Sequence, residues 1–122
     1  MASKLQKLRR QALRDQKGRC FYCSQPLWEE DIDNFVKIYG IRKSVSKHLR
    51  CTAEHLRSRQ DKGRDVRGNI AAACLWCNVQ RHRGRSGQAP APEIHQASVR
   101  ALVAQGRGER EAANSVDRVL AG

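Results

Sequence analysis

Apolar and basic residues alternate with helical spacing in the first segment of the chain. Leucine and alanine recur every three or four positions within Lys4–Arg14, and lysine and arginine occupy the other side. This pattern predicts an amphipathic basic helix, and Gly18 offers it a C-terminal stop. We expect the leucines to pack on the rest of the protein. The pattern leaves open whether the arginines face DNA or water.

A period of two residues replaces the helical spacing further along. From Ser46 to His55, apolar residues alternate with polar ones, which predicts a strand that ends at His55. Cys51 occupies an apolar position of this strand, so we expect it to be a buried free thiol. The apolar run Ile70–Ala73 fits either a second strand or a helical turn.

A short helix is predicted after the second apolar run, over Cys77–Arg83. It places Asn78 and His82, which are four positions apart, on the same face.

The remaining segments are polar or weakly apolar. Trp28–Val36 is predicted to be an acidic helical insertion that faces away from nucleic acid, and Arg57–Arg67 a polar loop. Breaker residues in Gly84–Pro92 indicate a linker. Helices are possible in Glu93–Gln105 and Glu111–Leu120, in a tail of low hydrophobicity that is expected to be partly disordered.

The composition indicates one small domain with tails. The chain has 122 residues, of which 39% are hydrophobic and 5% are aromatic, so a structural metal would help its small core. We expect a basic helix in residues 1–19, the compact domain in residues 20–84, and a linker with a weakly helical or partly disordered tail in residues 85–122.

The net charge is strongly positive. Lysine and arginine number 24 against 12 acidic residues, which gives +12. An excess of this size indicates a polyanionic partner, most simply nucleic acid, bound mainly through its phosphates. Charge alone separates neither DNA from RNA nor a binding module from an enzyme.

The start of the chain bears on its location. Met1–Lys4 is polar and basic, and no apolar run approaches membrane-spanning length. We therefore expect a cytoplasmic protein with no membrane partner, whose thiols stay reduced and available to metal. The sequence does not indicate an oligomeric state.

Four of the five cysteines form two short pairs, Cys20-x-x-Cys23 and Cys74-x-x-Cys77. Two such pairs complete a tetrahedral site, and a closed site of four thiolates is structural, so we expect structural Zn²⁺. Four unrelated buried cysteines are the alternative, but two such motifs are uncommon by chance. A redox function is disfavoured because no thioredoxin-like βαβ pattern surrounds either motif.

Polar residues enclosed by the cysteine pairs, or next to them, provide candidate catalytic groups. His55 is a candidate general base for activating water. Glu54, Asn78 and His82 are candidate ligands of a catalytic divalent metal that stabilises phosphate charge and the leaving oxygen. Asn69 either bonds the backbone of the opposing segment or orients His55.

The joint order of these motifs resembles the zinc-containing form of the HNH endonuclease family, found in bacterial and phage nucleases. The resemblance covers Cys20–His82, about half of the chain. It rests on four matching pieces: Cys20-Phe-Tyr-Cys23, Ala53-Glu-His-Leu56, Gly68-Asn-Ile-Ala-Ala-Ala-Cys74 and Cys74-Leu-Trp-Cys-Asn-Val-Gln-Arg-His82.

The resemblance implies an α+β fold with a small ββα-metal (His-Me finger) core, two antiparallel strands followed by a helix, plus flanking helices. It implies that His55 is the general base, that Asn69 is the family's central asparagine, and that Glu54, Asn78 and His82 occupy the metal-ligand positions. The implied activity is DNA cleavage with one divalent ion (Mg²⁺, Mn²⁺, Ni²⁺ or Zn²⁺), leaving 3′-hydroxyl and 5′-phosphate ends. Three features depart from the family pattern: Glu54 replaces a more usual Asp or His, the Pro often found after the base is absent, and the insertion Glu29–Ser46 is longer than in the shortest family members.

The leading hypothesis is therefore a metal-dependent DNA endonuclease. Two alternatives stay open: a non-catalytic zinc-dependent nucleic-acid-binding module, and an RNA-directed nuclease. Arginines of the basic helix, the polar loop and the last helix of the motif are the candidate phosphate contacts: Arg9, Arg10, Arg14, Arg57, Arg59, Arg64 and Arg81.

Overall fold

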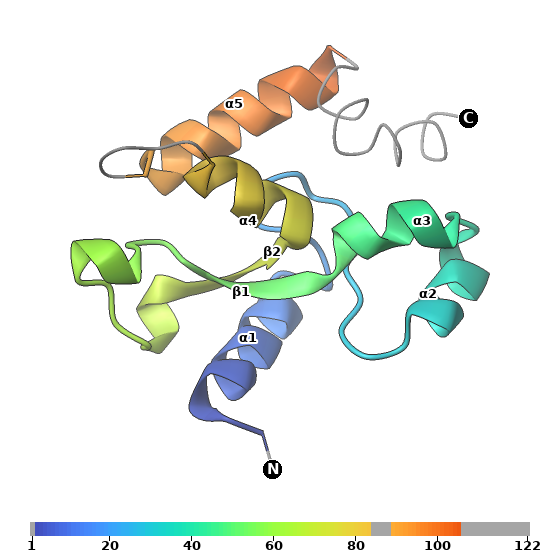
Figure 1. Ribbon diagram of the computed structural model, residues 1–122, viewed down its shortest axis with the longest axis horizontal. Helices are drawn as coiled ribbons and strands as arrows, with labels where there is room; N and C mark the ends of the chain where they lie inside the picture. The colour runs from blue at the N-terminus through green and yellow to red at the C-terminus, as the bar shows by residue number, and fades with distance from the viewer. Residues whose placement is uncertain (1, 84–88, 106–122) are drawn as a thin grey trace.

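The computed structural model describes residues 2–83 and 89–105. A two-stranded sheet lies at the centre of this part, with helices before, between and after its strands (Figure 1). The elements, in chain order, are α1 (Lys4–Asp15), α2 (Ile32–Tyr39), α3 (Lys43–Ser46), η1 (Lys47–Leu49), β1 (Cys51–His55), η2 (Arg59–Asp61), η3 (Arg67–Asn69), β2 (Ile70–Cys74), α4 (Leu75–His82) and α5 (Pro92–Ala104).

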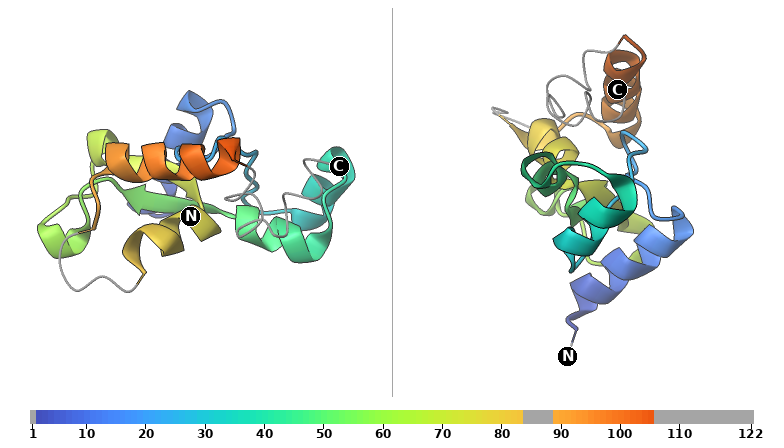
Figure 2. Two further views of the ribbon diagram at one scale, coloured as in Figure 1. Left: turned by 90° about the horizontal axis from the view of Figure 1, so that it is seen from above. Right: turned by 90° about the vertical axis from the view of Figure 1, so that its right-hand side faces the viewer.

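The sheet is antiparallel and its register is complete from end to end. Cys51 pairs with Cys74 at one end, and His55 pairs with Ile70 at the other. Helix α1 lies on one side of the sheet and α4 on the other, with α5 beyond α4 (Figures 1 and 2). Strand, strand and helix α4 follow one another in the chain, so the predicted α+β class with a ββα core is confirmed.

Local signals explain where α1 begins and where α2 begins and ends. Ser3 and Gln6 form a capping box at the start of α1, in which each side chain bonds the other's backbone amide. Helix α2 begins after Asp31, whose carboxylate accepts from the amide of Asn34. It ends at Gly40, where φ is +67°, a conformation that glycine adopts without steric cost.

The core is built from few large side chains. Tyr22, Phe35, Ile41 and Leu49 are almost completely buried, and every residue of β2 is buried. The three alanines of β2 carry little volume, which lets helices approach the sheet closely on both sides. At the end of α1, the Gln16 amide both donates to and accepts from the backbone of Ala72.

The predicted strand Ser46–His55 is wrong in its first half. Ser46 ends α3 and the next three residues form η1, so β1 begins only at Cys51. The Ser46 hydroxyl donates to the carbonyl of Ile41, and the Ser46 carbonyl accepts from the indole of Trp28. These buried bonds fix a helical turn in a segment whose apolar residues happen to alternate.

Other predicted elements hold with shifted ends. The predicted basic helix corresponds to α1, and the apolar run Ile70–Ala73 is a strand rather than a helical turn. Helix α4 begins two residues earlier than the predicted Cys77. The acidic segment Trp28–Val36 is helical only from Ile32.

The tail is helical as far as the structure describes it. Helix α5 matches the helix predicted in Glu93–Gln105, and its His95 and Val99 are buried. Most of the predicted linker and the predicted helix Glu111–Leu120 lie outside the described residues. Within residues 2–83 and 89–105, no helix has the length and apolar character needed to cross a membrane.

Candidate active site and metal centre

The two cysteine pairs meet in one cluster. Cys20 and Cys23 lie in the turn after α1, Cys74 ends β2, and Cys77 lies in the first turn of α4. All four sulfur atoms lie within 4.8 Å of one another, and the sulfurs of Cys23 and Cys74 are 3.9 Å apart. Tetrahedral Zn–S bonds of about 2.3 Å require sulfur separations of about 3.8 Å. The cluster therefore fits a structural metal such as zinc.

Backbone amides stabilise negative charge on this cluster. The amides of Tyr22 and Cys74 approach the sulfur of Cys20, and the amide of Cys77 approaches the sulfur of Cys74. Burial by itself raises the pKa of Cys20, but hydrogen bonds from the other three thiols lower that pKa well below its usual range. Hydrogen bonds with Cys20 and Cys23 raise the pKa of Cys74 and of Cys77, so before a metal binds the negative charge is centred on Cys20. Thiolate is the form that binds metal.

Cys51 lies outside the cluster. It is buried, as expected from the sequence, and burial raises the pKa of its thiol to about 12. It is therefore an inert neutral thiol at ordinary pH.

The carboxylate of Glu54 is buried between β1 and α4. Its Oε2 accepts hydrogen bonds from the hydroxyl of Tyr22 (2.9 Å) and from Nη1 of Arg81 (3.1 Å). Its Oε1 lies 3.3 Å from Nε2 of His82. Glu54 is 1% exposed, so Arg81 balances its charge inside the protein, and one of its oxygens is directed at His82.

Strand β1 and helix α4 together bring the candidate metal ligands onto one face. Alternate residues of a strand share a face, so Thr52 and Glu54 both face α4. The Asn78 amide nitrogen donates to the Thr52 hydroxyl (3.0 Å), one helical turn before the contact of His82 with Glu54. The structure thus brings Glu54 and His82 together and holds Asn78 beside them.

The spacing of Glu54 and His82 fits a divalent ion. Neighbouring ligands of an octahedral ion with bonds of about 2.1 Å lie about 3 Å apart, and the oxygen of Glu54 and nitrogen of His82 are 3.3 Å apart. The side-chain nitrogen of Asn78 donates to the Thr52 hydroxyl. Its side-chain oxygen is the atom that would serve as a metal ligand. Among the described residues, the four cysteines are the one cluster of three or more His, Cys, Asp or Glu side chains with metal-binding geometry. The fit is to an open site with few protein ligands.

His55 ends β1 and faces the loop that follows, not α4. Its Nε2 lies 2.7 Å from Oδ1 of Asp65, and Oδ2 of Asp65 accepts from Nη2 of Arg59 (3.0 Å). The hydrogen bond to His55 is the main cause that lowers the pKa of the Asp65 carboxyl. His55 and Glu54 are neighbours in the chain, but their side chains leave β1 in different directions, His55 toward Asp65 and Glu54 toward His82.

Asn69 ties the two ends of this loop together. Its side-chain oxygen accepts from the amide of Arg57 (2.7 Å), and its side-chain nitrogen donates to the carbonyls of Arg57 and Arg64 (3.0 Å each). Of the two roles considered from the sequence, the backbone contact is the one present.

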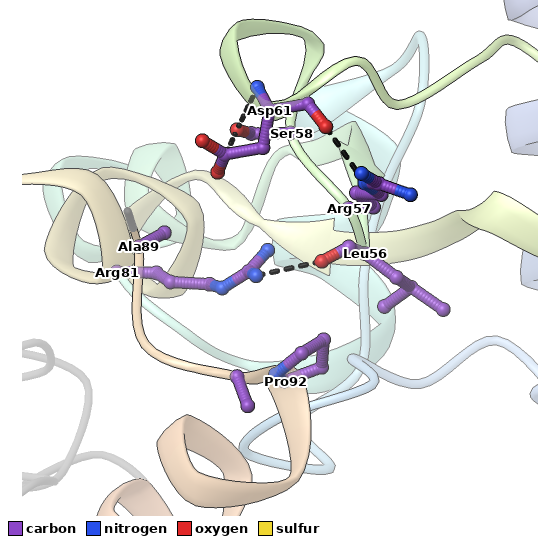
Figure 3. A pocket seen from close by; sticks show the side chains of 8 residues that line it. Leu56, Arg57, Ser58, Asp61, Arg81, Ala89 and Pro92 are labelled. Atoms are coloured by element: carbon purple, nitrogen blue, oxygen red, sulfur yellow. Dashed lines mark hydrogen bonds between the residues drawn. The ribbon is translucent and has the colours of Figure 1, made fainter. Parts of the chain in front are cut away.

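Arg81 is the arginine for which the sequence prediction must be corrected. It is 4% exposed, and its guanidinium bonds Glu54 and the backbone carbonyls of His55, Leu56 and Pro90. This side chain is one of those that line a pocket of about 360 Å³ between the loop after β1 and the start of α5. Figure 3 shows it reaching the Leu56 carbonyl. A guanidinium buried and used in this way has no donor directed at nucleic acid.

The other candidate phosphate contacts fall into two groups. Arg9 and Arg10 of α1 pair with Glu29 and Glu30, which neutralise them. The acidic segment thus packs against the basic helix. A second group consists of exposed arginines, of which Arg59 also pairs with Asp65. They are Arg14, Arg57, Arg59 and Arg64.

Three residues that matter here were missed or misassigned from the sequence. Tyr22, inside the first cysteine turn, bonds Glu54; Asp65 bonds His55; and Arg81 balances Glu54. The only available signal was their place between motif residues. Nothing local in the sequence indicates which acid of the polar loop reaches His55, because its contact with Asp65 depends on how the loop folds back.

Comparison with known proteins supplies one match. The family model of the HNH endonuclease matches residues 42–84. No curated protein and no solved structure matches the chain. The matched segment contains β1, β2 and α4 with the second cysteine pair, Glu54 and His55. Over residues 42–84, about a third of its length, the chain is therefore similar to the HNH endonuclease family.

Proposed function

We propose that this protein is a metal-dependent endonuclease that hydrolyses phosphodiester bonds in DNA. The observation that carries the proposal is the HNH match, together with the Glu54–His82 pair formed between β1 and α4 inside the matched segment. A nuclease of this family is a hydrolase that acts on nucleic acid, and the net charge of +12 is in keeping with a polyanionic substrate.

His55 is the proposed general base. It is the last residue of β1, with a side chain that is 13% exposed and held by Asp65. A partly buried imidazole of fixed orientation is suited to removing a proton from water. Asn69 supports this role by fixing the backbone of the loop that His55 faces.

Glu54 and His82 are the proposed ligands of a catalytic divalent ion, with the oxygen of Asn78 as a third. Such an ion, when bound, would stabilise charge on the phosphate and the leaving oxygen. The ion itself, Mg²⁺, Mn²⁺, Ni²⁺ or Zn²⁺, is not distinguished by this donor set. Arg81 and Tyr22 hold the second oxygen of Glu54, so the carboxylate is oriented before any ion binds.

The structural metal of the four-cysteine cluster is proposed to be Zn²⁺. The proposed DNA contacts are Arg14, Arg57, Arg59 and Arg64, which are exposed. Contacts of this kind bind phosphates and carry no sequence information. The proposed domain is residues 20–84, flanked by the basic N-terminal helix and the C-terminal tail, and the proposed location is the cytoplasm.

One observation favours a non-catalytic nucleic-acid-binding module as a second candidate. The Glu54 carboxylate is already neutralised by Arg81 and bonded by Tyr22, as in a purely structural buried ion pair. In that case the HNH framework is retained and no ion is bound between β1 and α4.

Cleavage of supercoiled plasmid separates these candidates. We expect nicking that requires Mg²⁺, Mn²⁺ or Ni²⁺, stops with EDTA, and falls at least 100-fold in His55→Ala, since a general base contributes about 10²- to 10⁴-fold. His48→Ala removes a histidine on the neighbouring η1 and serves as the matched control. DNA binding without cleavage under any of these metals favours the binding module, and faster cleavage of RNA than of DNA reassigns the substrate.

A further inference from the structure

We propose that Asp65 is a positioning residue that holds His55 by Nε2 and leaves Nδ1 as its basic nitrogen. The catalytic consequence rests on the proposed nuclease function, whereas the effect of Asp65 on the imidazole does not.

The 2.7 Å contact determines which nitrogen carries the proton. An ionised carboxylate has only acceptors, so Nε2 of His55 must donate to Oδ1 of Asp65. In the neutral ring the lone pair is then on Nδ1. A carboxylate that orients a catalytic histidine in this way also stabilises the imidazolium that forms when the base takes a proton.

Arg59 completes the cluster through the carboxylate. Its Nε lies 3.3 Å from Nε2 of His55, but that nitrogen has no lone pair once it donates to Asp65. The better bond of Arg59 is from Nη2 to Oδ2 of Asp65, at 3.0 Å. Arg59 therefore fixes the second oxygen of Asp65 while the first oxygen holds His55.

The backbone around Asp65 is fixed independently of this contact. Asn69 bonds the carbonyl of Arg64, the residue directly before Asp65. The loop is also closed tightly at Gly63, whose amide donates to the Ser58 carbonyl at 2.7 Å. A rigid backbone at Arg64 limits where the Asp65 carboxylate can lie, so the central asparagine acts on His55 through the loop.

The contact differs from an ordinary surface ion pair in its setting. Exposed pairs add little because both side chains remain mobile and solvated. Here the His55 side chain is 13% exposed and that of Asp65 is 32% exposed, and both ends sit on restrained backbone. The contact between Asp65 and His55 therefore serves mainly to orient the imidazole and contributes less to the stability of the fold.

The ionisation of Asp65 supports a role over a broad pH range. The hydrogen bond to His55 and the bond from Arg59 lower the pKa of this carboxyl below 3.8. A lowered carboxyl pKa means that the interaction is present above the ordinary value and is lost as the pH falls through the lowered value. From about pH 5 upward the carboxylate is ionised and can accept the proton of Nε2 of His55.

Asp65→Asn tests the proposal in the full-length, metal-loaded protein. In the wild type we expect ¹⁵N NMR of the histidine side chains to show His55 protonated on Nε2 with a lone pair on Nδ1. An amide can donate as well as accept, so the variant no longer requires His55 to be protonated on Nε2, and we expect the population of the other tautomer to rise. We expect kcat for plasmid nicking to fall by about 10- to 1000-fold, less than or equal to the loss in His55→Ala, with KM unchanged.

Asp33→Asn is the matched control, because it removes the same charge from an exposed aspartate on α2 that pairs with Lys43. It should leave both the tautomer and kcat as in the wild type. A wild-type spectrum in which His55 carries its proton on Nδ1, with the lone pair on Nε2, overturns the proposal. If the wild-type protein does not cleave nucleic acid, the NMR measurement still tests the contact, so failure of the proposed function is distinguished from failure of this inference.

Discussion

Glu54 and Arg81 form a buried ion pair between β1 and α4, and this pair stands beside the candidate metal site. Removing two charges from water is costly, and the cost is offset only when the remaining donors and acceptors are satisfied. Tyr22 and His82 provide further partners for the carboxylate, and three backbone carbonyls accept from the guanidinium. Burial raises the pKa of Tyr22, and the charge of Glu54 raises it further, so its hydroxyl remains a donor.

Breaking this pair from either side should destabilise the fold. We expect Glu54→Gln or Arg81→Met to lower the free energy of unfolding by about 3–5 kcal/mol, because each leaves a buried charge without its partner. The double variant should lose less than the sum of the two. Urea denaturation of the zinc-loaded protein measures all three.

Glu30→Gln is the matched control for this series. Glu30 pairs with Arg10 at the surface with 71% of its side chain exposed, so its loss should cost less than about 1 kcal/mol. If Glu54→Gln and Glu30→Gln lower the free energy of unfolding equally, the buried pair contributes no more to stability than the surface pair does.

At the scale of elements, the loop between β1 and β2 decides the surroundings of His55. Its length and polarity were evident in the sequence, and so was the presence of Asn69. The sequence did not show which groups the loop brings back to β1, because the side chain of Asn69 bonds backbone groups up to twelve residues away. The alternating pattern before β1 misled because hydrogen bonds of Ser46, one to Ile41 nearby and one to Trp28 eighteen residues away, hold the segment in a helical turn.

Gly63 is predicted to be the most sensitive backbone position of this loop. A Cβ at this position would lie 1.6 Å from the carbonyl oxygen of Arg57. Gly63→Ala must therefore displace the loop, and we expect a loss of about 1–3 kcal/mol in unfolding free energy together with an altered His55 tautomer in the ¹⁵N spectrum.

Gly68→Ala provides the comparison within the same connection. No atom lies within 4 Å of a Cβ at Gly68, so this variant should be neutral or slightly stabilising. If Gly63→Ala is as well tolerated as Gly68→Ala, the tight closure of the loop does not contribute to the site.

At the scale of the whole molecule, the cysteine cluster connects segments that are far apart in the chain. It joins the turn after α1 to the junction of β2 and α4. Helix α5 packs over the same region, where Gln96 and Arg100 donate to the carbonyls of Phe21 and Tyr22. Because Tyr22 also bonds Glu54, its side chain links the turn of the cysteine cluster to the candidate catalytic carboxylate.

Loss of the structural metal should therefore unfold most of the protein. We expect Cys77→Ser to lose bound zinc and native NMR dispersion, since binding energy at a structural zinc site is folding energy, about 10–16 kcal/mol. Zinc content by mass spectrometry and a ¹H–¹⁵N spectrum measure this.

Cys51→Ala is the appropriate control, because Cys51 is a buried thiol outside the cluster. It should retain one zinc ion and cost about 1 kcal/mol. A native-like spectrum of Cys77→Ser without zinc would contradict the structural role of the cluster.

The sequence by itself determined the residues whose chemistry is tied to spacing. Two thiols separated by two residues reach one ion wherever the turn lies, and a helix places Asn78 and His82 on one face whatever packs against it. Tertiary structure alone decided that Arg81 is buried, that Tyr22 bonds Glu54 and that Asp65 holds His55. These contacts join residues 10 to 32 positions apart, so they arise from the packing of the loop, the sheet and α4 rather than from any local period.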